Sequence, residues 1–158
     1  MKMKRGTTLL SLFIALTLAM AAQAQPGWNW PEQEKDKAEE YNVLYSDAVK
    51  MQDWKTAIPP LQWLINTAPD LNQSLYVNGA KIYDNLAKVE KDAAQKDVYI
   101  DSLMLMYDMR MQYFDDSVNV MNRKVFKAYR YYIKDYSKSE WLLEMFDNTY
   151  AISGDGVM

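Results

Sequence analysis

Four aspartates in one stretch of the chain are the strongest candidates for catalytic chemistry: Asp97, Asp101, Asp108 and Asp115. At 100° per helical residue they fall within about 40° of one another. Paired carboxylates can exchange protons with a substrate or bind calcium. A helix that is otherwise buried can show the same pattern along a polar edge, and we favour this simpler interpretation.

A basic stripe with helical spacing follows the acidic one: Arg123, Lys127, Arg130 and Lys134. Facing residues in an antiparallel hairpin have residue numbers with a constant sum, so the two stripes are expected to pair. Three pairs share one sum: Asp108 with Arg123, Asp101 with Arg130, and Asp97 with Lys134. Exposed pairs contribute only about 0.2–1 kcal/mol each, so they would mainly fix the register. A groove that binds anions is the alternative role for the basic stripe.

Composition excludes several classes of site. The chain has no histidine and no cysteine, which removes the usual general base, the thiolate nucleophile and the ligands of most zinc sites. Its glycines form no phosphate-binding loop. Acidic residues number 21 against 18 basic ones, a balance that argues against nucleic acid as a partner. We therefore expect no cofactor, no metal site and no catalysis.

The elements that position these side chains are helices, and residues 38–70 show the pattern best. Tyr41, Leu44, Ala48 and Met51 recur at the spacing of one helix face. A second apolar stripe follows a short polar turn and ends before Pro69, which stops the helix. A helix pair with one apolar face needs a neighbour of similar shape to cover that face.

This hairpin resembles the tetratricopeptide repeat (TPR) family in the order and spacing of Tyr41, Leu44, Ala57, Leu61 and Pro69. It departs from the family at Tyr45, where the repeat has a small residue. Gly79 is that small residue in the next copy, one repeat length of about 34 residues later. The resemblance is strongest over residues 38–83 and covers the rest of the chain only as architecture.

With the hairpin included, the sequence predicts helices over about 32–51, 53–67, 71–90, 93–114 and 117–136, and a last one from 137 or 139 to 153. Pro59 and Pro60 predict that the second helix either kinks or begins at Pro59. Gly79 costs its helix about 1 kcal/mol relative to alanine, so a close approach of two helices is expected there. The fold class is thus all-α, a right-handed solenoid of three TPR-like hairpins.

The beginning of the chain has the features of a secretory signal peptide. Basic residues precede an apolar run from Leu9 to Ala22, and Ala22-Gln23-Ala24 is a small-x-small cleavage signal. The expected organisation is a signal peptide (1–24), an extended lead-in (25–31), the helical domain (32–153) and a flexible tail (154–158). Three of the 18 basic residues lie in the leader, so its removal would change the net charge from −3 to −6. We expect an exported, soluble protein, periplasmic or secreted, with no integral membrane segment after cleavage.

The TPR resemblance implies a concave groove lined by the first helix of each hairpin. Counted from the motif, six residues would point into it: Asn42, Ser46, Tyr76, Ala80, Tyr83 and Tyr129. Such a groove would hold a protein or an extended peptide. Surface packing is the alternative role for the tyrosines.

The last helix is more apolar than the end of a repeat array normally is. Four of its residues are candidates for docking on a second copy or a partner: Trp141, Leu142, Phe146 and Tyr150. Three functions follow, of which we favour the first: a non-catalytic scaffold, a carboxylate-based enzyme or small-molecule binder, and a structural subunit of an envelope complex. The leader and the cysteine-free, tyrosine-rich sequence are similar to those of exported TPR proteins of Bacteroidota.

Overall fold

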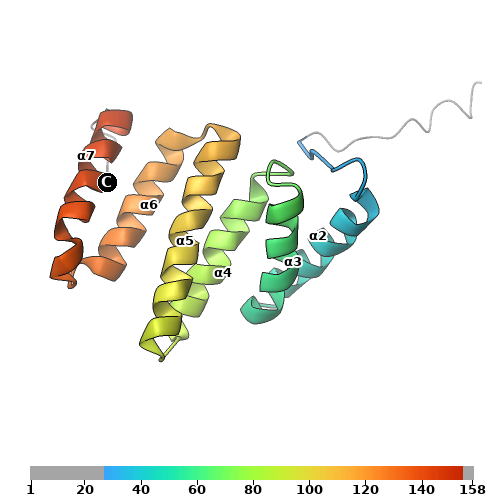
Figure 1. The fold of residues 1–158 in the computed structure, drawn as a ribbon, viewed down its shortest axis with the longest axis horizontal. Helices are drawn as coiled ribbons and strands as arrows, with labels where there is room; N and C mark the ends of the chain where they lie inside the picture. Colours follow the sequence, from blue (N-terminus) through green and yellow to red (C-terminus); the bar gives the residue numbers. More distant parts are fainter. Residues whose placement is uncertain (1–26, 155–158) are drawn as a thin grey trace, which may run out of the picture.

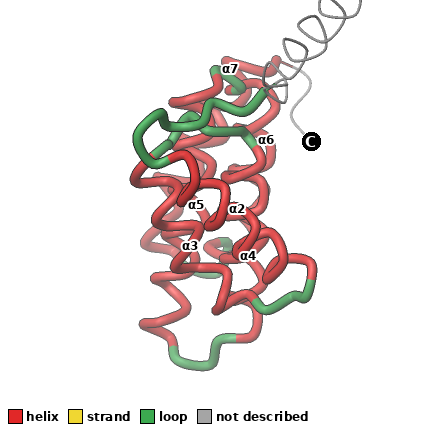
Figure 2. The backbone as a smooth tube through the Cα atoms, turned by 90° about the vertical axis from the view of Figure 1, so that its right-hand side faces the viewer, coloured by secondary structure: helices red, strands yellow, loops and turns green. Residues whose placement is uncertain are grey.

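The computed structural model describes residues 27–154, and in this range the chain is all-α (Figure 1), as expected. Its helices are α2 (Lys35–Lys50), α3 (Trp54–Thr67), α4 (Ser74–Val89), α5 (Ala93–Phe114), α6 (Ser117–Tyr132), the short 3-10 helix η1 (Tyr136–Lys138) and α7 (Ser139–Ser153). Figure 2 shows them joined by short loops, without a strand in this range. The predicted leader and residues 155–158 of the predicted tail lie outside the described residues.

Helices that are consecutive in the chain are neighbours in space. The pairs α2–α3, α4–α5 and α6–α7 each pack together, and α3–α4 and α5–α6 contacts join one pair to the next (Figure 1). Buried apolar side chains come from all six α-helices, so the core runs along the row. Each helix therefore has an apolar neighbour, as the one-sided hydrophobic patterns require.

Aspartates set the beginnings of several elements. The Asp53 carboxylate accepts a hydrogen bond from the Thr56 amide (3.3 Å), and Asp92 accepts one from the Gln95 amide (2.8 Å). These bonds satisfy amides that have no partner within the first turn of a helix. Asp135 does the same for η1 by accepting from the Ser137 amide (3.0 Å). The helix expected over 117–136 therefore ends at Tyr132, and α7 follows after this turn.

The two prolines do not delay the start of α3. This helix begins at Trp54, behind the Asp53 cap, and continues through Pro59 and Pro60 to Thr67. The alternative that it begins at Pro59 is therefore wrong. Pro60 is buried, whereas Pro59 is exposed. The burial of the apolar face of α3 holds the helix although two backbone donors are missing.

The expected close approach at Gly79 is confirmed. A Cβ atom at this position would lie 2.6 Å from Met106 Sδ of α5 and 3.4 Å from Leu61 Cδ2 of α3. Tyr45, the large residue at the corresponding place in α2, is 1% exposed, and its hydroxyl accepts a hydrogen bond from Asn78 of α4 (3.4 Å). In the first pair, the Tyr45 ring fills this space. In the second pair, the close packing of α5 on Gly79 closes it.

The lead-in is fastened to the loop between α3 and α4. The Asn29 amide donates to the Leu71 carbonyl (2.8 Å), and the Asn72 side chain donates to the Gly27 carbonyl (2.6 Å). Trp28 and Trp30 stack with ring centroids 5.1 Å apart and pack against the core. The described part of the lead-in is therefore held against the loop between α3 and α4.

Candidate functional site

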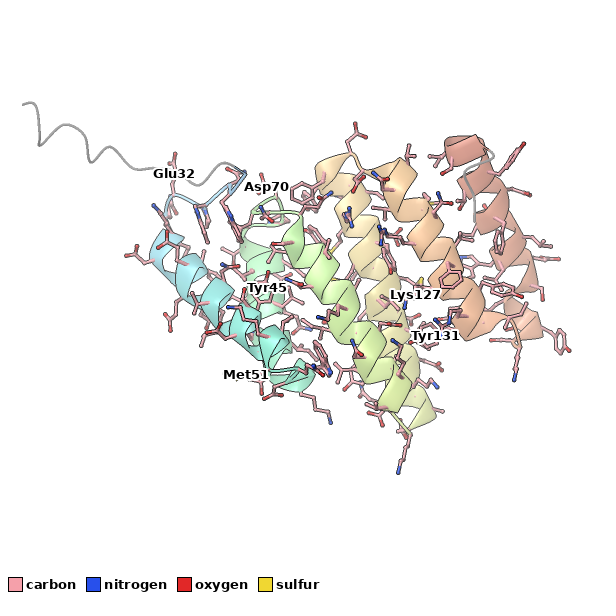
Figure 3. All side chains as sticks on the ribbon, turned by 180° about the vertical axis from the view of Figure 1, so that it is seen from behind. Glu32, Tyr45, Met51, Asp70, Lys127 and Tyr131 are labelled. Carbon is pink, nitrogen blue, oxygen red and sulfur yellow. The ribbon has the colours of Figure 1, made fainter. Side chains whose placement is uncertain are left out.

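A cleft of about 240 Å³ opens between α4 and α6, with α5 behind it. We call it the α4–α6 cleft. Lys127 and Tyr131 lie on the side of α6 that faces α4 (Figure 3). Its lining residues are Tyr76, Val77, Ala80, Lys81 and Asp84 of α4, Tyr107 and Arg110 of α5, and Arg123 and Lys127 of α6.

Helical spacing explains why these residues share one cleft. Tyr76, Ala80 and Asp84 follow one another at intervals of four along α4, and Arg123 and Lys127 do so along α6. Tyr76 is 1% exposed, and its hydroxyl donates to the Pro69 carbonyl (2.6 Å). The apolar wall of the cleft is therefore held in place at the beginning of α4.

Asp84 closes one end of the cleft by joining α4 to α6. Its carboxylate accepts hydrogen bonds from Lys127 (2.7 Å) and Tyr131 (2.9 Å) of α6, and it pairs with Lys88 (2.6 Å) of its own helix. Burial alone would raise the pKa of Asp84, but the hydrogen bonds from Lys127, Lys88 and Tyr131 lower it below its ordinary value. Asp84 is therefore held as a carboxylate.

A second carboxylate, Asp116, is not part of the cleft lining but pairs with Arg110, which is. It lies in the turn between α5 and α6 and pairs with Arg110 of α5, while Gln73 at the start of α4 donates to it (2.7 Å). Asn119 donates to its second oxygen (2.8 Å). Hydrogen bonds, first from Asn119 and then from Arg110, lower the pKa of Asp116 despite the opposing effect of desolvation. Asp84 and Asp116 are thus each held by three side chains.

Three donors inside the cleft have no acceptor among the described residues. Arg110 Nε is buried without a hydrogen-bond partner. Arg123 is exposed and makes no ion pair there, and Tyr107, which is 8% exposed, makes no hydrogen bond through its hydroxyl. Burial, followed by the Asp84 charge, raises the pKa of Tyr107, so the phenol stays protonated at neutral pH.

The six predicted groove residues do not form one surface. Tyr76 and Ala80 line the α4–α6 cleft, but Tyr83 does not; it is 4% exposed, accepts a hydrogen bond from Gln62 (3.4 Å) and packs near Tyr99. Tyr83 therefore has no part in this cleft, because α3 and α5 cover it. Asn42 and Ser46 are partly exposed on α2, away from the cleft lining. Tyr129 is 42% exposed and packs edge-on against Phe146 of α7.

The predicted pairing of the charged stripes is also wrong. Asp108 pairs with Lys124, the residue after Arg123, and Asp101 accepts from the Tyr132 hydroxyl (3.4 Å). Lys127 turns to Asp84, and neither Asp101–Arg130 nor Asp97–Lys134 is an ion pair in the described structure. The antiparallel register was nearly right, but α6 is rotated so that part of its basic stripe faces the cleft. Asp115 is the C-cap of α5, in the left-handed region at φ 47°.

The four predicted docking residues divide between core and surface. Leu142 is 6% exposed and belongs to the core, so its place on a docking surface is wrong. Phe146 is partly buried, Trp141 packs edge-on against Tyr132 with centroids 5.6 Å apart, and Tyr150 is 59% exposed. By helical geometry, the side of α7 opposite Leu142 carries Glu140, Glu144, Asp147 and Asn148, all exposed. The side of α7 away from its buried stripe is therefore polar.

Sequence reasoning missed Asp84, Tyr107 and Arg110. The spacing of Asp84 and Lys88 on one helix shows their ion pair, but it does not show that Lys127 joins them from 43 residues away. Tyr107 ends a continuous apolar run, in which no residue stands out. No cluster of three or more potential metal ligands occurs within residues 27–154, and no helix there is long and apolar enough to cross a membrane.

Comparisons with protein families, with curated proteins and with solved structures give no match to this chain.

Proposed function

We propose that this protein is an exported scaffold, similar in construction to TPR proteins, that binds a partner protein or peptide in the α4–α6 cleft without catalysis. One observation carries the proposal. The cleft lies between the first helices of the second and third pairs, where the TPR resemblance puts a groove, and two of the predicted groove residues, Tyr76 and Ala80, line it. The three packed pairs support a solenoid, in which such a groove runs across successive first helices.

The chemistry of the cleft favours binding over catalysis. Its lining contains one carboxylate, Asp84, which is held by Lys127, Lys88 and Tyr131. A carboxylate held ionised in this way is a poor general acid, and three side chains already donate to it or pair with it. The aspartates of the acidic stripe lie outside the cleft lining.

The size of the cleft favours a peptide over a small molecule. Its volume of about 240 Å³ is below the ~300–1,000 Å³ that is usual for small-molecule sites. One side chain of a partner, with its neighbouring backbone lying along the helices, fits such a space. The extended surface on either side would supply the remaining contacts.

Assembly through α7 is the second candidate function. Leu143 (65% exposed) and Tyr150 (59% exposed) are seven residues apart and therefore lie on the same side of that helix. They flank the buried stripe rather than occupy the polar outer face. This favours a small contact site beside α6, which would suit a structural subunit of an envelope complex.

A pull-down from envelope extract tests the main proposal. Three baits are compared: the wild type, Val77→Trp at the rim of the cleft (47% exposed), and Val98→Trp, an exposed valine of α5 outside it (54% exposed). We expect Val77→Trp to lose a partner that the wild type and Val98→Trp both retain, because the indole fills the cleft. If both variants retain the same partners, the cleft is not the binding site.

A further inference from the structure

The α4–α6 cleft has more hydrogen-bond donors than acceptors. Four of its lining residues are cations, Lys81, Arg110, Arg123 and Lys127, against one carboxylate, Asp84. The chain as a whole carries a net charge of −3. The cleft is thus a cationic site in an acidic protein, and it is the place where the basic stripe of α6 meets donors from α5.

The carboxylates around the cleft bind other donors than Arg110 Nε, Arg123 and Tyr107. Asp84 already takes Lys127, Lys88 and Tyr131, and Asp116 takes Arg110, Gln73 and Asn119. Arg110 Nε, the Arg123 guanidinium and the Tyr107 hydroxyl remain without an acceptor in the described structure. Burying a donor without a partner is costly, which applies to Arg110 Nε and to Tyr107, and exposed Arg123 adds a positive charge beside them. The arrangement therefore favours a ligand that brings acceptor atoms.

We propose that the α4–α6 cleft binds a carboxylate of a peptide partner, with Arg123, Arg110 and Tyr107 as the donors. This inference rests on the proposed function and specifies its ligand. A guanidinium presents parallel donors that match the two oxygens of a carboxylate. Tyr107 adds a neutral donor from a ring that is 8% exposed, where hydrogen bonds to a charge are strong.

The apolar wall defines the rest of the ligand. Tyr76, Val77 and Ala80 line the α4 side of the cleft beside the cations. They can cover the methylene groups of a glutamate or the residue before a chain end. The carboxylate can thus come from an acidic side chain or from the C-terminus of a peptide. Both sources present the same two oxygens to Arg123.

The test begins with a random peptide library displayed on phage and selected on the purified protein. Enriched sequences are synthesised with a free or an amidated C-terminus, and with each acidic residue replaced by its amide. Dissociation constants are then measured for the wild type, Arg123→Gln, Arg123→Lys, Tyr107→Phe and Val77→Trp. Arg130→Gln is the matched control, since Arg130 is an exposed arginine of the same helix that lies outside the cleft lining. Thermal melts establish that each variant is folded.

We expect enriched peptides to be acidic and to bind Arg123→Gln about tenfold more weakly or worse, as for a lost hydrogen bond between charged groups. Tyr107→Phe weakens binding without lowering the melting temperature, Arg123→Lys restores part of the affinity, and Arg130→Gln changes it little. Loss of binding on C-terminal amidation identifies a chain end as the source. Loss on replacement of an internal acidic residue identifies a side chain.

Other outcomes overturn the proposal in distinguishable ways. If enriched peptides lose binding to Val77→Trp but are not acidic and are insensitive to Arg123→Gln, the cleft binds peptides and the carboxylate site is wrong. If acidic peptides respond equally to Arg123→Gln and Arg130→Gln, the attraction is general surface charge and the site is again wrong. If no peptide is enriched, or none responds to Val77→Trp, the proposed function fails as well.

Discussion

Gly79 lies where α4 packs tightly against Met106 of α5. A side chain there would enter the space of Met106 Sδ, 2.6 Å from an added Cβ. Gly79→Leu is expected to lower the free energy of unfolding by about 1–3 kcal/mol, the usual cost of overpacking, although leucine is a better helix former than glycine. Urea denaturation measures the difference.

The Met106→Ala variant supplies the control for Gly79. Alone, it should be destabilising, because it removes a buried side chain that is 4% exposed. Combined with Gly79→Leu, it should cost less than the sum of the two single changes, since it makes room for the leucine. A melting temperature that Gly79→Leu leaves unchanged, or strictly additive effects, would remove the argument for close approach.

The Asp84 carboxylate joins α4 to α6, and its charge is expected to stabilise the fold. Asp84→Asn is expected to destabilise the protein at pH 7 by about 1.5–3 kcal/mol, the range for hydrogen bonds to charged groups. The change removes the charge that Lys127 and Lys88 share and weakens the link from α4 to α6. Urea denaturation of the two proteins at several pH values checks it.

The pH dependence of that difference has a definite sign. The pKa of Asp84 is lower in the folded protein than its ordinary value of 3.8. Its contribution to stability is therefore fully present above pH 3.8 and is lost as the pH falls through the folded-state pKa. The gap between wild type and Asp84→Asn should narrow over this window. A gap that stays constant down to pH 2 would show that the charge of Asp84 has no part in holding the helices.

At the scale of elements, the α5–α6 hairpin has a register that can be tested by double-mutant cycles. Asp108 pairs with Lys124, whose side chain is 13% exposed, and not with Arg123. A cycle of Asp108→Asn with Lys124→Gln should give a coupling of about 0.2–1 kcal/mol, as for a partly exposed ion pair. The matched cycle with Arg123→Gln should give almost none. Coupling to Arg123 instead of Lys124 would restore the register predicted from the sequence.

This one-residue difference shows which parts of the fold are encoded locally. The helices over 93–114 and 53–67 follow from periodicity and from the caps at Asp92 and Asp53, which depend only on neighbouring residues. The partner of Asp108 depends on how far α6 is rotated about its axis. Adjacent residues on a helix point about 100° apart. The orientation of α6 therefore decides whether Arg123 or Lys124 faces Asp108, and the local sequence does not fix that orientation.

Packing between helices, which the local sequence does not fix, also explains why the cleft was not predicted. The count from the TPR motif puts Tyr76, Ala80 and Tyr83 in a groove, but it does not show which neighbour covers each of them. Tyr83 is enclosed by contacts with Gln62 and Tyr99, which are distant in the sequence. Tyr107 lies in an apolar run, where nothing local marks its hydroxyl as free. The helices were thus predictable and the cleft was not, because the cleft depends on the packing between pairs.

In the whole molecule, the described chain is a row of helix pairs, and charged side chains are distributed unevenly along it. The lead-in is held at the loop between α3 and α4 through Asn29 and Asn72, and α7 presents acidic residues at one end of the row. Between them, the α4–α6 cleft gathers positive charge in a chain that is acidic overall. A partner with carboxylates would be repelled by most of the surface and attracted at this cleft, which favours a specific site over general adhesion.

Site-specific photocrosslinking in cells tests the central claim, binding in the α4–α6 cleft, most directly. Benzoylphenylalanine is placed at Val77 on the rim of the cleft, at Leu143 on α7, and at Val98 as an exposed control. We predict that a partner is crosslinked from position 77 and not from position 143 or 98, and that Arg123→Gln in the same chain reduces the product. Crosslinking from position 143 alone would contradict this account and would show instead that the protein works through its last helix.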